Sequence, residues 1–348
     1  MAIRVVQWTT GNVGKFSARA VVRHPDLDLV GCYAWSPDKV GRDVGELCGI
    51  DHVGVAATND VDALLALQPD CVVYNPMWHD TDELVRILEA GANVVSTAAF
   101  ITGGNLGDGR ERIADACKRG GVSMFGTGVS PGFAELLAIV TAGICDRVDK
   151  ITVQESADTT FYDSPATEIL AGFSRPIDDP GLQAATAEGT AVFAEAVAMV
   201  ADALGVELDD ITCTAEYAQT TEDLVMESWT IKAGCVAGMF VSWQGRVDDR
   251  TIIDLNMRWK KGQTLEPNWP IEDGWVIQVD GRPSVTAKVG FLPPPDFEAT
   301  TMAEFMALGH IMTAMPAVNA IPSVVAAAPG IVTYPEMPLV LPRGLVQL

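Results

Sequence analysis

The first third of the chain alternates short apolar runs with longer segments in which apolar positions recur at helical spacing. Runs of this length are typical of buried strands, and the periodic segments are typical of helices that cover a sheet. We expect strands at residues 3–8, 26–34, 53–57, 70–74, 93–96 and 122–125, and helices at residues 14–23, 60–67, 80–90 and 108–119. Strands and helices that alternate in this way predict a doubly wound, parallel α/β sheet.

The pattern changes after residue 150, where long alternating runs follow one another. A strand at 151–156, a loop-rich stretch to residue 184 and a helix at 188–204 come first. Strands are then expected at residues 211–218, 234–247, 251–259, 274–279 and 284–291. Gly, Asp and Pro separate these runs, as hairpin turns require. The second half therefore predicts an α+β domain with a mainly antiparallel sheet.

The last part of the chain returns to a helical pattern at residues 301–327, which Pro316 and Pro322 are expected to kink or break. We expect three parts: a first domain at 1–148, a second at 149–299, and a helical segment at 300–348 that packs back on the first. The richest apolar stretch, at 312–332, contains three prolines and an asparagine. No window holds about 18 uninterrupted apolar residues, so no membrane span is expected.

Charge and composition narrow the function classes. The 348 residues include 46 acidic and 23 basic side chains, a net charge of −23. Without a basic run, this charge argues against binding to nucleic acid or to an anionic membrane. Seven dispersed cysteines and a start without a leader pattern predict a cytoplasmic protein with reduced thiols. The four histidines are isolated, so we expect no metal site.

The strongest motif joins the first strand to the first helix. It contains Thr9, Thr10, Gly11, Asn12, Val13 and Gly14. Gly11 and Gly14 match the last two glycines of GxGxxG, and Thr9 stands at the place of the first. A tight turn without a ligand would look the same, but five further strand and helix units follow in order. We therefore predict a Rossmann domain in which these six residues bind a dinucleotide pyrophosphate.

The end of the second strand bears on the choice of cofactor. In NAD enzymes an acid there commonly binds the ribose diol. Here Ser36 and Lys39 are available instead, with Arg42 just beyond. A hydroxyl and a cation suit a 2′-phosphate, so we favour NADP, while NAD stays open. Lys39 and Arg42 would also be unremarkable as solvated surface charges.

Three more loops follow strands four, five and six, where ligands bind in open α/β sheets. They contain residues 74–78, 96–102 and 126–133. We place Asn75, Pro76, Thr97 and Ala98 at the cofactor. The alternative is that these segments are ordinary crossover loops.

These motifs resemble those of the dihydrodipicolinate reductase-like oxidoreductases, most closely the branch with 2,4-diaminopentanoate dehydrogenase and native amine dehydrogenases. The resemblance is carried by residues 8–14 (WTTGNVG), 36–41 (SPDKVG), 126–133 (GTGVSPGF), 319–322 (NAIP) and 328–330 (APG). It implies NAD(P) binding, a Rossmann domain with an α+β substrate domain, and oligomers that are commonly dimers. We therefore expect a homodimer that binds a small-molecule substrate.

Two departures from the family pattern limit what the resemblance implies. True dihydrodipicolinate reductases carry paired histidines followed by a lysine and an SGT segment. Here residues 154–163 read QESADTTFYD, and no histidine or lysine occurs between Ile151 and Arg175. That reaction is therefore not expected. The amine dehydrogenases would have a carboxylate after the fifth strand, but residues 91–107 contain no acid.

Hydride transfer needs a group that manages a proton or polarises the substrate. The catalytic candidates are Glu155, Tyr162, His79 and Thr102, with Asp158 and Asp163 nearby. Each has a plain structural alternative, as a cap, a turn residue or a solvated side chain. Trp78, Phe100, Phe133 and Asp158 are expected to line the substrate pocket, although most aromatic residues are simply core.

The sequence thus predicts an NADP-preferring oxidoreductase for a small, largely apolar amine or imine, which would aminate a ketone or aldehyde reductively. Two alternatives remain open. One is a carbonyl or alcohol dehydrogenase that works without ammonia, which the missing carboxylate favours. The other is a non-catalytic NADP-binding sensor. Turnover that depends on ammonia, turnover without ammonia, and tight cofactor binding without turnover would separate the three.

Overall fold

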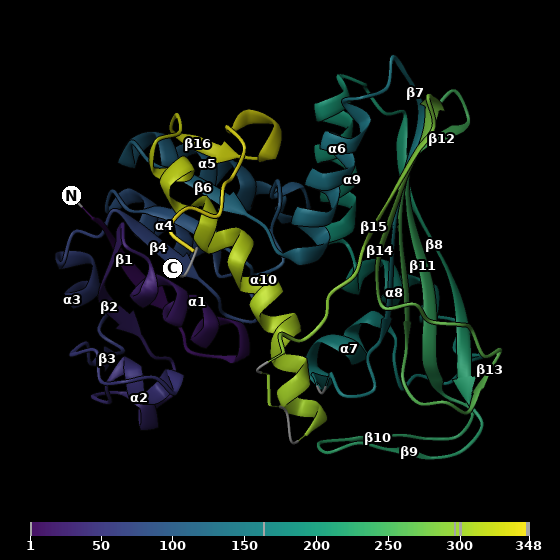
Figure 1. Ribbon diagram of the computed structural model, residues 1–348, viewed down its shortest axis with the longest axis horizontal. Coiled ribbons are helices and arrows are strands. Elements are labelled where there is room, and N and C mark those ends of the chain that lie inside the picture. The colour runs from purple at the N-terminus through teal and green to yellow at the C-terminus, as the bar shows by residue number, and fades with distance from the viewer. Residues whose placement is uncertain (1, 163, 296, 299–300, 346–348) are drawn as a thin grey trace. The chain divides into compact units, whose positions relative to one another are not determined.

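The computed structural model describes residues 2–162, 164–295, 297–298 and 301–345. The chain divides into two compact units (Figure 1). Unit 1 contains Met1–Phe133 and Ala307–Leu348, and unit 2 contains Ala134–Met306. The C-terminal segment thus belongs to the same unit as the N-terminal sheet. The first boundary lies before residue 148, because the helix after Phe133 packs on the strands of unit 2.

Unit 1 contains a seven-stranded sheet in which every strand pair is parallel. The strand order is β16-β6-β5-β4-β1-β2-β3. The strands are β1 (Ile3–Trp8), β2 (Leu27–Tyr33), β3 (Ala57–Thr58), β4 (Cys71–Tyr74), β5 (Asn93–Ser96), β6 (Ser123–Gly126) and β16 (Gly330–Val332). The predicted doubly wound sheet is confirmed. Its order reverses at β1, which is where ligands bind in this architecture.

Five helices of the N-terminal part of unit 1 pack apolar residues around the sheet, of which strands β4, β5 and β6 are fully buried. They are α1 (Asn12–Arg23), α2 (Val44–Cys48), α3 (Val61–Ala66), α4 (Thr81–Glu89) and α5 (Asp108–Gly120). Leu84, Ile87 and Ile113 lie in the core with Val72 and Val94. Burial of such side chains is the main favourable contribution to folding. Hydrophobic periodicity predicted four of these helices for this reason, but not the short α2.

The third strand forms at residues 57–58 rather than near residues 53–57. The cause is Asp43, whose carboxylate accepts hydrogen bonds from the backbone N–H groups of Gly45, Val53 and Gly54. These bonds cap the start of α2 and draw residues 53 and 54 into a turn. The strand therefore begins only after the turn is complete.

The C-terminal helix α10 (Met302–Val325) confirms the helix expected at residues 301–327, and of the kink or break expected at Pro316 and Pro322 the break does not occur. Ala317, Val318 and Ile321 are buried in this helix, and their packing outweighs the proline penalty. Among the described residues, one stretch, Ala307–Val325, is long and apolar enough to cross a membrane by length and composition. A buried core helix meets the same criterion.

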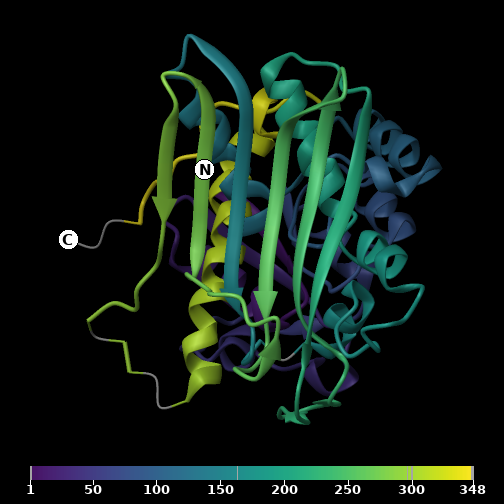
Figure 2. The same cartoon turned by 90° about the vertical axis from the view of Figure 1, so that its right-hand side faces the viewer.

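Unit 2 contains a second seven-stranded sheet, in the order β13-β8-β11-β12-β7-β14-β15. The strands are β7 (Arg147–Asp158), β8 (Asp210–Thr220), β11 (Val236–Val247), β12 (Arg250–Lys260), β13 (Leu265–Glu266), β14 (Gly274–Arg282) and β15 (Val285–Val289), and a separate small pair is β9 (Leu224–Val225) with β10 (Thr230–Ile231). Figure 2 shows the long strands of the sheet side by side. Only β7 and β12 pair in parallel, so the predicted, mainly antiparallel sheet is confirmed.

Four helices of unit 2 are α6 (Ala134–Ala142), α7 (Pro165–Ala171), α8 (Leu182–Gly189) and α9 (Val192–Leu204). α6 packs on β7 and β14, and α9 packs on β11 and β12. The stretch expected to be loop up to residue 184 instead contains α7 and the start of α8. Pro165 occupies the first turn of α7, where it needs no hydrogen-bond partner. A contact distant in sequence then holds this helix in place.

That contact is a buried ion pair between Lys261, which follows β12, and Glu168 on α7. Lys261 is fully buried, and its Nζ lies 2.7 Å from Glu168 Oε1. Nζ also donates to the carbonyl oxygens of Thr159, at 2.6 Å, and Tyr162, at 2.8 Å. Glu168 Oε2 accepts from the backbone N–H of Ser164. The pair thus ties the segment between β7 and α7 to the end of β12.

Removal of one partner would leave a buried charge uncompensated, so we expect Lys261→Met to lower the free energy of unfolding by about 3–5 kcal/mol. Lys261→Met with Glu168→Leu should recover much of this loss, because no buried charge remains. Lys232→Met is the control, since its pair with Asp223 is exposed and should contribute less than about 1 kcal/mol. Urea titration measures all three. A loss for Lys261→Met no larger than for Lys232→Met would contradict the assignment.

Candidate functional site

The turn between β1 and α1 leaves the N-terminus of α1 ready to bind an anion. Gly11 is the N-cap residue of α1. No side chain caps this end of the helix with a hydrogen bond, and the first turn contains no acid. The N–H groups of a first turn have no partners within the helix, and the helix dipole places partial positive charge there. A phosphate group is the ligand that such an end binds best.

Gly11 and Gly14 have different reasons to be glycine. A Cβ built on Gly14 would lie 2.5 Å from the carbonyl oxygen of Thr9, so the packing of the turn itself excludes a side chain. A Cβ built on Gly11 meets no atom within 4 Å. Gly11 also has a φ of −73°, which any residue adopts. The fold therefore does not require glycine at position 11, whereas close approach of a ligand would.

A chain of buried amides and hydroxyls connects the ends of three neighbouring strands. Gln7 Nε2 donates to Asn75 Oδ1 at 2.8 Å, and Asn75 Nδ2 donates to Thr97 Oγ1 at 2.8 Å. Gln7 is fully buried and Asn75 nearly so. The residues follow or end β1, β4 and β5 in that order across the sheet. The structure thus brings the predicted loops after β4 and β5 together, and a hydrogen bond from Thr9 Oγ1 to the Asn75 carbonyl joins them to the turn that holds Thr9.

Lys39 also reaches this turn. Its Nζ donates to the carbonyl oxygen of Thr10 at 3.2 Å and lies 3.3 Å from Thr10 Oγ1. Arg42 instead pairs with Glu46 on α2. Within the described part of the chain, no acidic side chain forms an ion pair with Lys39. Lys39 is therefore the cation at the end of β2 that can turn to a phosphate, with Ser36 three residues before it.

The loop after β4 exposes two large apolar side chains and holds one buried ring nitrogen. Met77 is 53% exposed and Trp78 is 50% exposed. Nδ1 of His79 is buried, and no hydrogen-bond partner is found for it among the described residues. Below the loop, the Tyr74 hydroxyl donates to Glu83 at 2.7 Å, and burial raises the pKa of Glu83. These features fix the base of the loop and leave its tip accessible.

The loops after β5 and β6 are shaped by packing as well as by any ligand. Phe100 lies in the core of unit 1, which accounts for its apolar side chain without a substrate. Thr102 Oγ1 accepts from the N–H of Gly104. A Cβ on Gly126 would meet the carbonyl oxygen of Phe100 at 1.9 Å. Phe133, by contrast, is 37% exposed at the end of unit 1.

In unit 2, Glu155 on β7 accepts two indole N–H groups. Trp259 Nε1 lies 2.7 Å from Oε1, and Trp275 Nε1 lies 3.3 Å from Oε2. Asp158 accepts from the N–H of Thr160 and from Gln263 Nε2, as a turn residue does. Sequence reasoning placed both acids correctly on or beside the strand. The indole partners come from β12 and β14 and could not be read from the sequence.

Tyr162 follows β7 in the same unit. Desolvation, and secondarily the charge of Glu168, raises the pKa of its phenol, which therefore stays protonated at neutral pH. Its backbone carbonyl is held by Lys261. Asp163 lies outside the described residues.

Sequence reasoning missed Gln7, Glu83 and Lys261. A glutamine inside an apolar strand was a signal for Gln7, because a buried amide needs partners. Lys261 lies far along the chain from the stretch of residues 151–175, in which no lysine occurs. Only the pairing of β12 with β7 brings it to that stretch.

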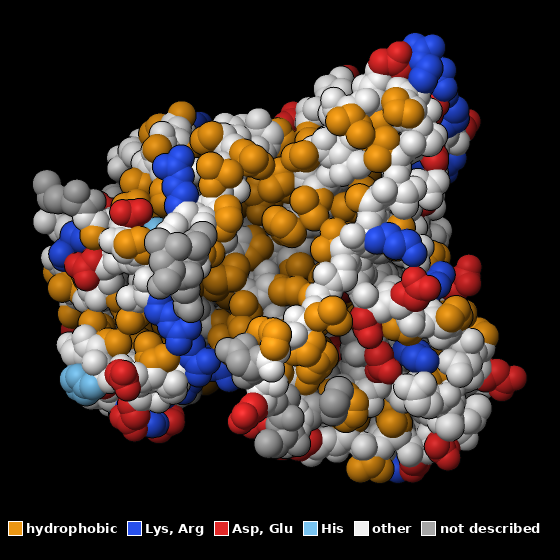
Figure 3. All heavy atoms as spheres, viewed as in Figure 1, with side chains coloured by type: hydrophobic (Ala, Val, Ile, Leu, Met, Phe, Trp, Pro, Cys, Tyr) orange, Lys and Arg blue, Asp and Glu red, His pale blue; other side chains and the backbone are white. Residues whose placement is uncertain are grey.

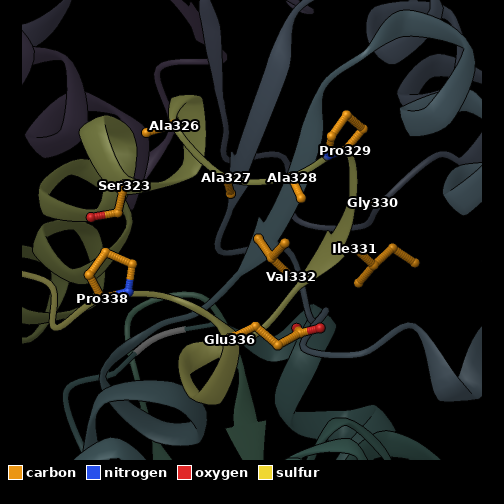
Figure 4. A pocket seen from close by; sticks show the side chains of 10 residues that line it. All are labelled: Ser323, Ala326, Ala327, Ala328, Pro329, Gly330, Ile331, Val332, Glu336 and Pro338. Carbon is orange, nitrogen blue, oxygen red and sulfur yellow. The ribbon is translucent and has the colours of Figure 1, made fainter.

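One cavity lies apart from the turn. This cavity of about 410 Å³ is lined by the end of α10, by β16 and by the segments on either side of β16, among them Ser323, Pro329 and Glu336 (Figure 4). Three strands separate β16 from β1, so this cavity is not the glycine-rich site. On the face in Figure 3, Lys and Arg form separate small groups. Among the described residues, no cluster of His, Cys, Asp and Glu suits a metal ion.

The fold and the turn define the class: a Rossmann-type α/β protein with a second, mixed-sheet unit. Residues 133–347 match the model of the 2,4-diaminopentanoate dehydrogenase C-terminal domain family. An amine dehydrogenase of Streptomyces virginiae is 31% identical over 97% of this chain and 96% of that protein. The 2,4-diaminopentanoate dehydrogenase of Acetoanaerobium sticklandii is 26% identical over 99% of this chain and 95% of its own.

The solved structure of an amine dehydrogenase from Mycobacterium smegmatis has a TM-score of 0.80 at 20% identity, and the match covers 99% of this chain and 98% of that one. At this identity the structure shows the shared fold. The sequence matches show more, and the chain belongs to the 2,4-diaminopentanoate dehydrogenase C-terminal domain family. The resemblance inferred from the motifs is thereby confirmed.

The two glycines give a matched pair of variants. Gly11→Val should keep a melting temperature near that of the wild type, because its Cβ enters open space. It should weaken NADPH binding at least about tenfold, or about 1.4 kcal/mol, because the side chain occupies the path of the pyrophosphate. Gly14→Ala should instead destabilise the fold by about 1–3 kcal/mol through its clash with Thr9. Thermal unfolding and fluorescence titration measure these effects. Unchanged NADPH affinity in folded Gly11→Val would refute the site.

Proposed function

We propose that this protein is an NAD(P)-dependent oxidoreductase that interconverts small, largely apolar amines with their carbonyl counterparts through the imine. The observation that carries the proposal is Gly11 at the start of α1. The space around it is open, and the fold itself does not require glycine at this position. The similarity to an amine dehydrogenase over nearly the whole chain supports the amine chemistry.

The nicotinamide ring would supply the hydride, and the chain would bind and orient the rest of the dinucleotide. Gly11 and the first turn of α1 suit the pyrophosphate, since they offer free N–H groups and space. Asn75 and Thr97 lie at the neighbouring strand ends, where the ring half of a dinucleotide is expected.

In the proposed reaction, a ketone or aldehyde and ammonium lose water to form an iminium ion. The hydride then adds to its carbon, which gives the amine and the oxidised cofactor. The protein must favour a positively charged intermediate and provide a proton for the departing oxygen.

Two groups of unit 2 suit those tasks. The two indole N–H groups hold the Glu155 carboxylate in place, and its negative charge would favour a cation. Tyr162 has a raised phenol pKa and stays a hydrogen-bond donor at neutral pH. We assign charge stabilisation to Glu155 and proton donation to Tyr162. His79 and Thr102 remain candidates in unit 1.

We further propose a preference for NADP over NAD, based on Lys39. Its ammonium lies at the end of β2 and contacts the glycine-rich turn. Ser36 offers a hydroxyl on the same short segment. The oxygens of a 2′-phosphate accept hydrogen bonds both from a hydroxyl and from an ammonium group.

Lys39→Ala tests the cofactor preference. The KM for NADPH should rise about tenfold, because one charge-assisted hydrogen bond is lost, while the KM for NADH changes little. Arg42→Ala is the matched control, since Arg42 already pairs with Glu46. Steady-state kinetics with each cofactor measure the effect. An equal rise for both cofactors would assign Lys39 to the shared pyrophosphate instead.

A second function, reduction of carbonyls without ammonia, is favoured by one observation. No acid occurs at residues 91–107, where the amine dehydrogenases are expected to carry one. On this alternative the chain would transfer hydride directly to a C=O group, and Tyr162 would protonate the resulting alkoxide.

The deciding experiment follows NADPH absorbance with a panel of small ketones and aldehydes, with and without ammonium, and repeats it with NADH. We expect consumption only when ammonium is present. Consumption without ammonium would favour the carbonyl alternative. Tight cofactor binding without consumption would contradict both and support the sensor.

A further inference from the structure

We propose that Gln7 is a positioning residue that takes over the task of the missing first glycine in the dinucleotide turn. By this proposal its side-chain amide holds the carbonyl of Thr9 so that the turn keeps a shape that threonine disfavours. The inference rests on the proposed dinucleotide binding and is independent of the amine chemistry.

The turn has the backbone of glycine but the side chain of threonine. Thr9 occupies the first-glycine place of the motif and has a φ of +70°. This left-handed region is easy for glycine and unfavourable for a β-branched residue, whose Cβ crowds the backbone. A conformation of this kind persists only where the surroundings hold it.

Three hydrogen bonds hold Thr9 in this conformation. Its N–H donates to the carbonyl oxygen of Tyr33 at 3.0 Å, and its Oγ1 donates to that of Asn75 at 3.0 Å. Its own carbonyl oxygen accepts from Gln7 Nε2 at 2.9 Å. The first two would fix the position of the residue, and the third fixes the direction of the carbonyl.

The orientation of the Gln7 amide follows from its partners. Nε2 faces the backbone carbonyl oxygens of Thr9 and Trp8, which can only accept, and it also donates to Asn75 Oδ1 at 2.8 Å. Oε1 is buried and has no hydrogen-bond partner among the described residues. A buried acceptor without a partner is unfavourable. The hydrogen bonds donated by Nε2 therefore have to stabilise this side-chain orientation.

The carbonyl of Thr9 in turn determines how closely α1 can approach β1. A Cβ on Gly14 would lie 2.5 Å from this oxygen and 3.2 Å from Gln7 Nε2. The first turn of α1 thus packs directly on the Thr9 carbonyl and the Gln7 amide. If that carbonyl turned, the N–H groups that are proposed to bind the pyrophosphate would move with the helix start.

A double-mutant cycle tests this coupling, because glycine at position 9 should make the support of Gln7 unnecessary. Gln7→Met keeps the volume and removes the donor. In the wild-type background it should raise the Kd for NADPH about tenfold, because the hydrogen bond to the Thr9 carbonyl is lost together with the one to Asn75 Oδ1. In the Thr9→Gly background the same change should raise Kd by less than about threefold.

Asn93→Leu is the matched control. Asn93 is a buried amide at the opposite end of β5, where it bonds to the carbonyl oxygen of Asp70 and the N–H of Ser123. Its loss should lower the melting temperature and leave the NADPH Kd unchanged. With turnover measurable, Gln7→Met should raise the KM for NADPH and leave kcat nearly unchanged, as loss of uniform binding does.

An equal rise in Kd in both backgrounds would overturn the proposal, as would an unchanged Kd in folded Gln7→Met. If Gln7→Met alone fails to fold, the double variant decides. It folds and binds NADPH if Gln7 supports Thr9, and failure of the double variant to fold would contradict the proposal. Failure of the wild type itself to bind NADPH or NADH would refute the proposed function instead.

Discussion

The left-handed turn at Thr9 is the constraint on which the proposed site depends. It ends β1, sets the distance to Gly14 and thereby fixes where α1 begins. Because the residue is threonine, the conformation needs the hydrogen bonds that Thr9 donates to the carbonyl oxygens of Tyr33 and Asn75 and the one that it accepts from Gln7. Gln7 lies on β1 itself, and Tyr33 and Asn75 lie at the ends of the two strands beside it. The turn is therefore held in place only within the intact parallel sheet. The hydrogen bonds that stabilise the fold at Thr9 thus also shape the proposed dinucleotide site.

Unit 2 uses a different device to fix its loops. There an ion pair between a buried lysine after β12 and a buried glutamate on α7 holds the loop segments in place. Lys261 satisfies its three donors on Glu168 and on two carbonyls of the segment that contains Tyr162. The side chain proposed as proton donor therefore stands on a segment with little freedom, which catalysis by a positioned acid requires. In both units, polar groups buried behind the surface hold the groups that are proposed to act.

The sequence predicted the parallel sheet, the mainly antiparallel sheet and the glycine turn, because periodicity and glycine placement are local signals. It also predicted the helix α10, which runs through its two prolines without a break while Val318 and Ile321 are buried. It failed for α7, which Lys261 supports from the end of a distant strand. Local signals cannot reveal such contacts. Gln7 differs, because a glutamine inside an apolar strand is a local signal of a buried polar contact, but its partners at Thr9 and Asn75 are visible only in the folded sheet. The roles assigned to Glu155 and Tyr162 stay predictions.

The most direct measurement of the central claim follows the hydride itself. NADPH carrying deuterium at C4 of the nicotinamide, on each face in turn, would be incubated with the protein, a small ketone and ammonium. The proposal predicts an amine that carries one deuterium at the former carbonyl carbon from one of the two labelled cofactors. An alcohol that carries the deuterium, or an absence of label in any product, would contradict it.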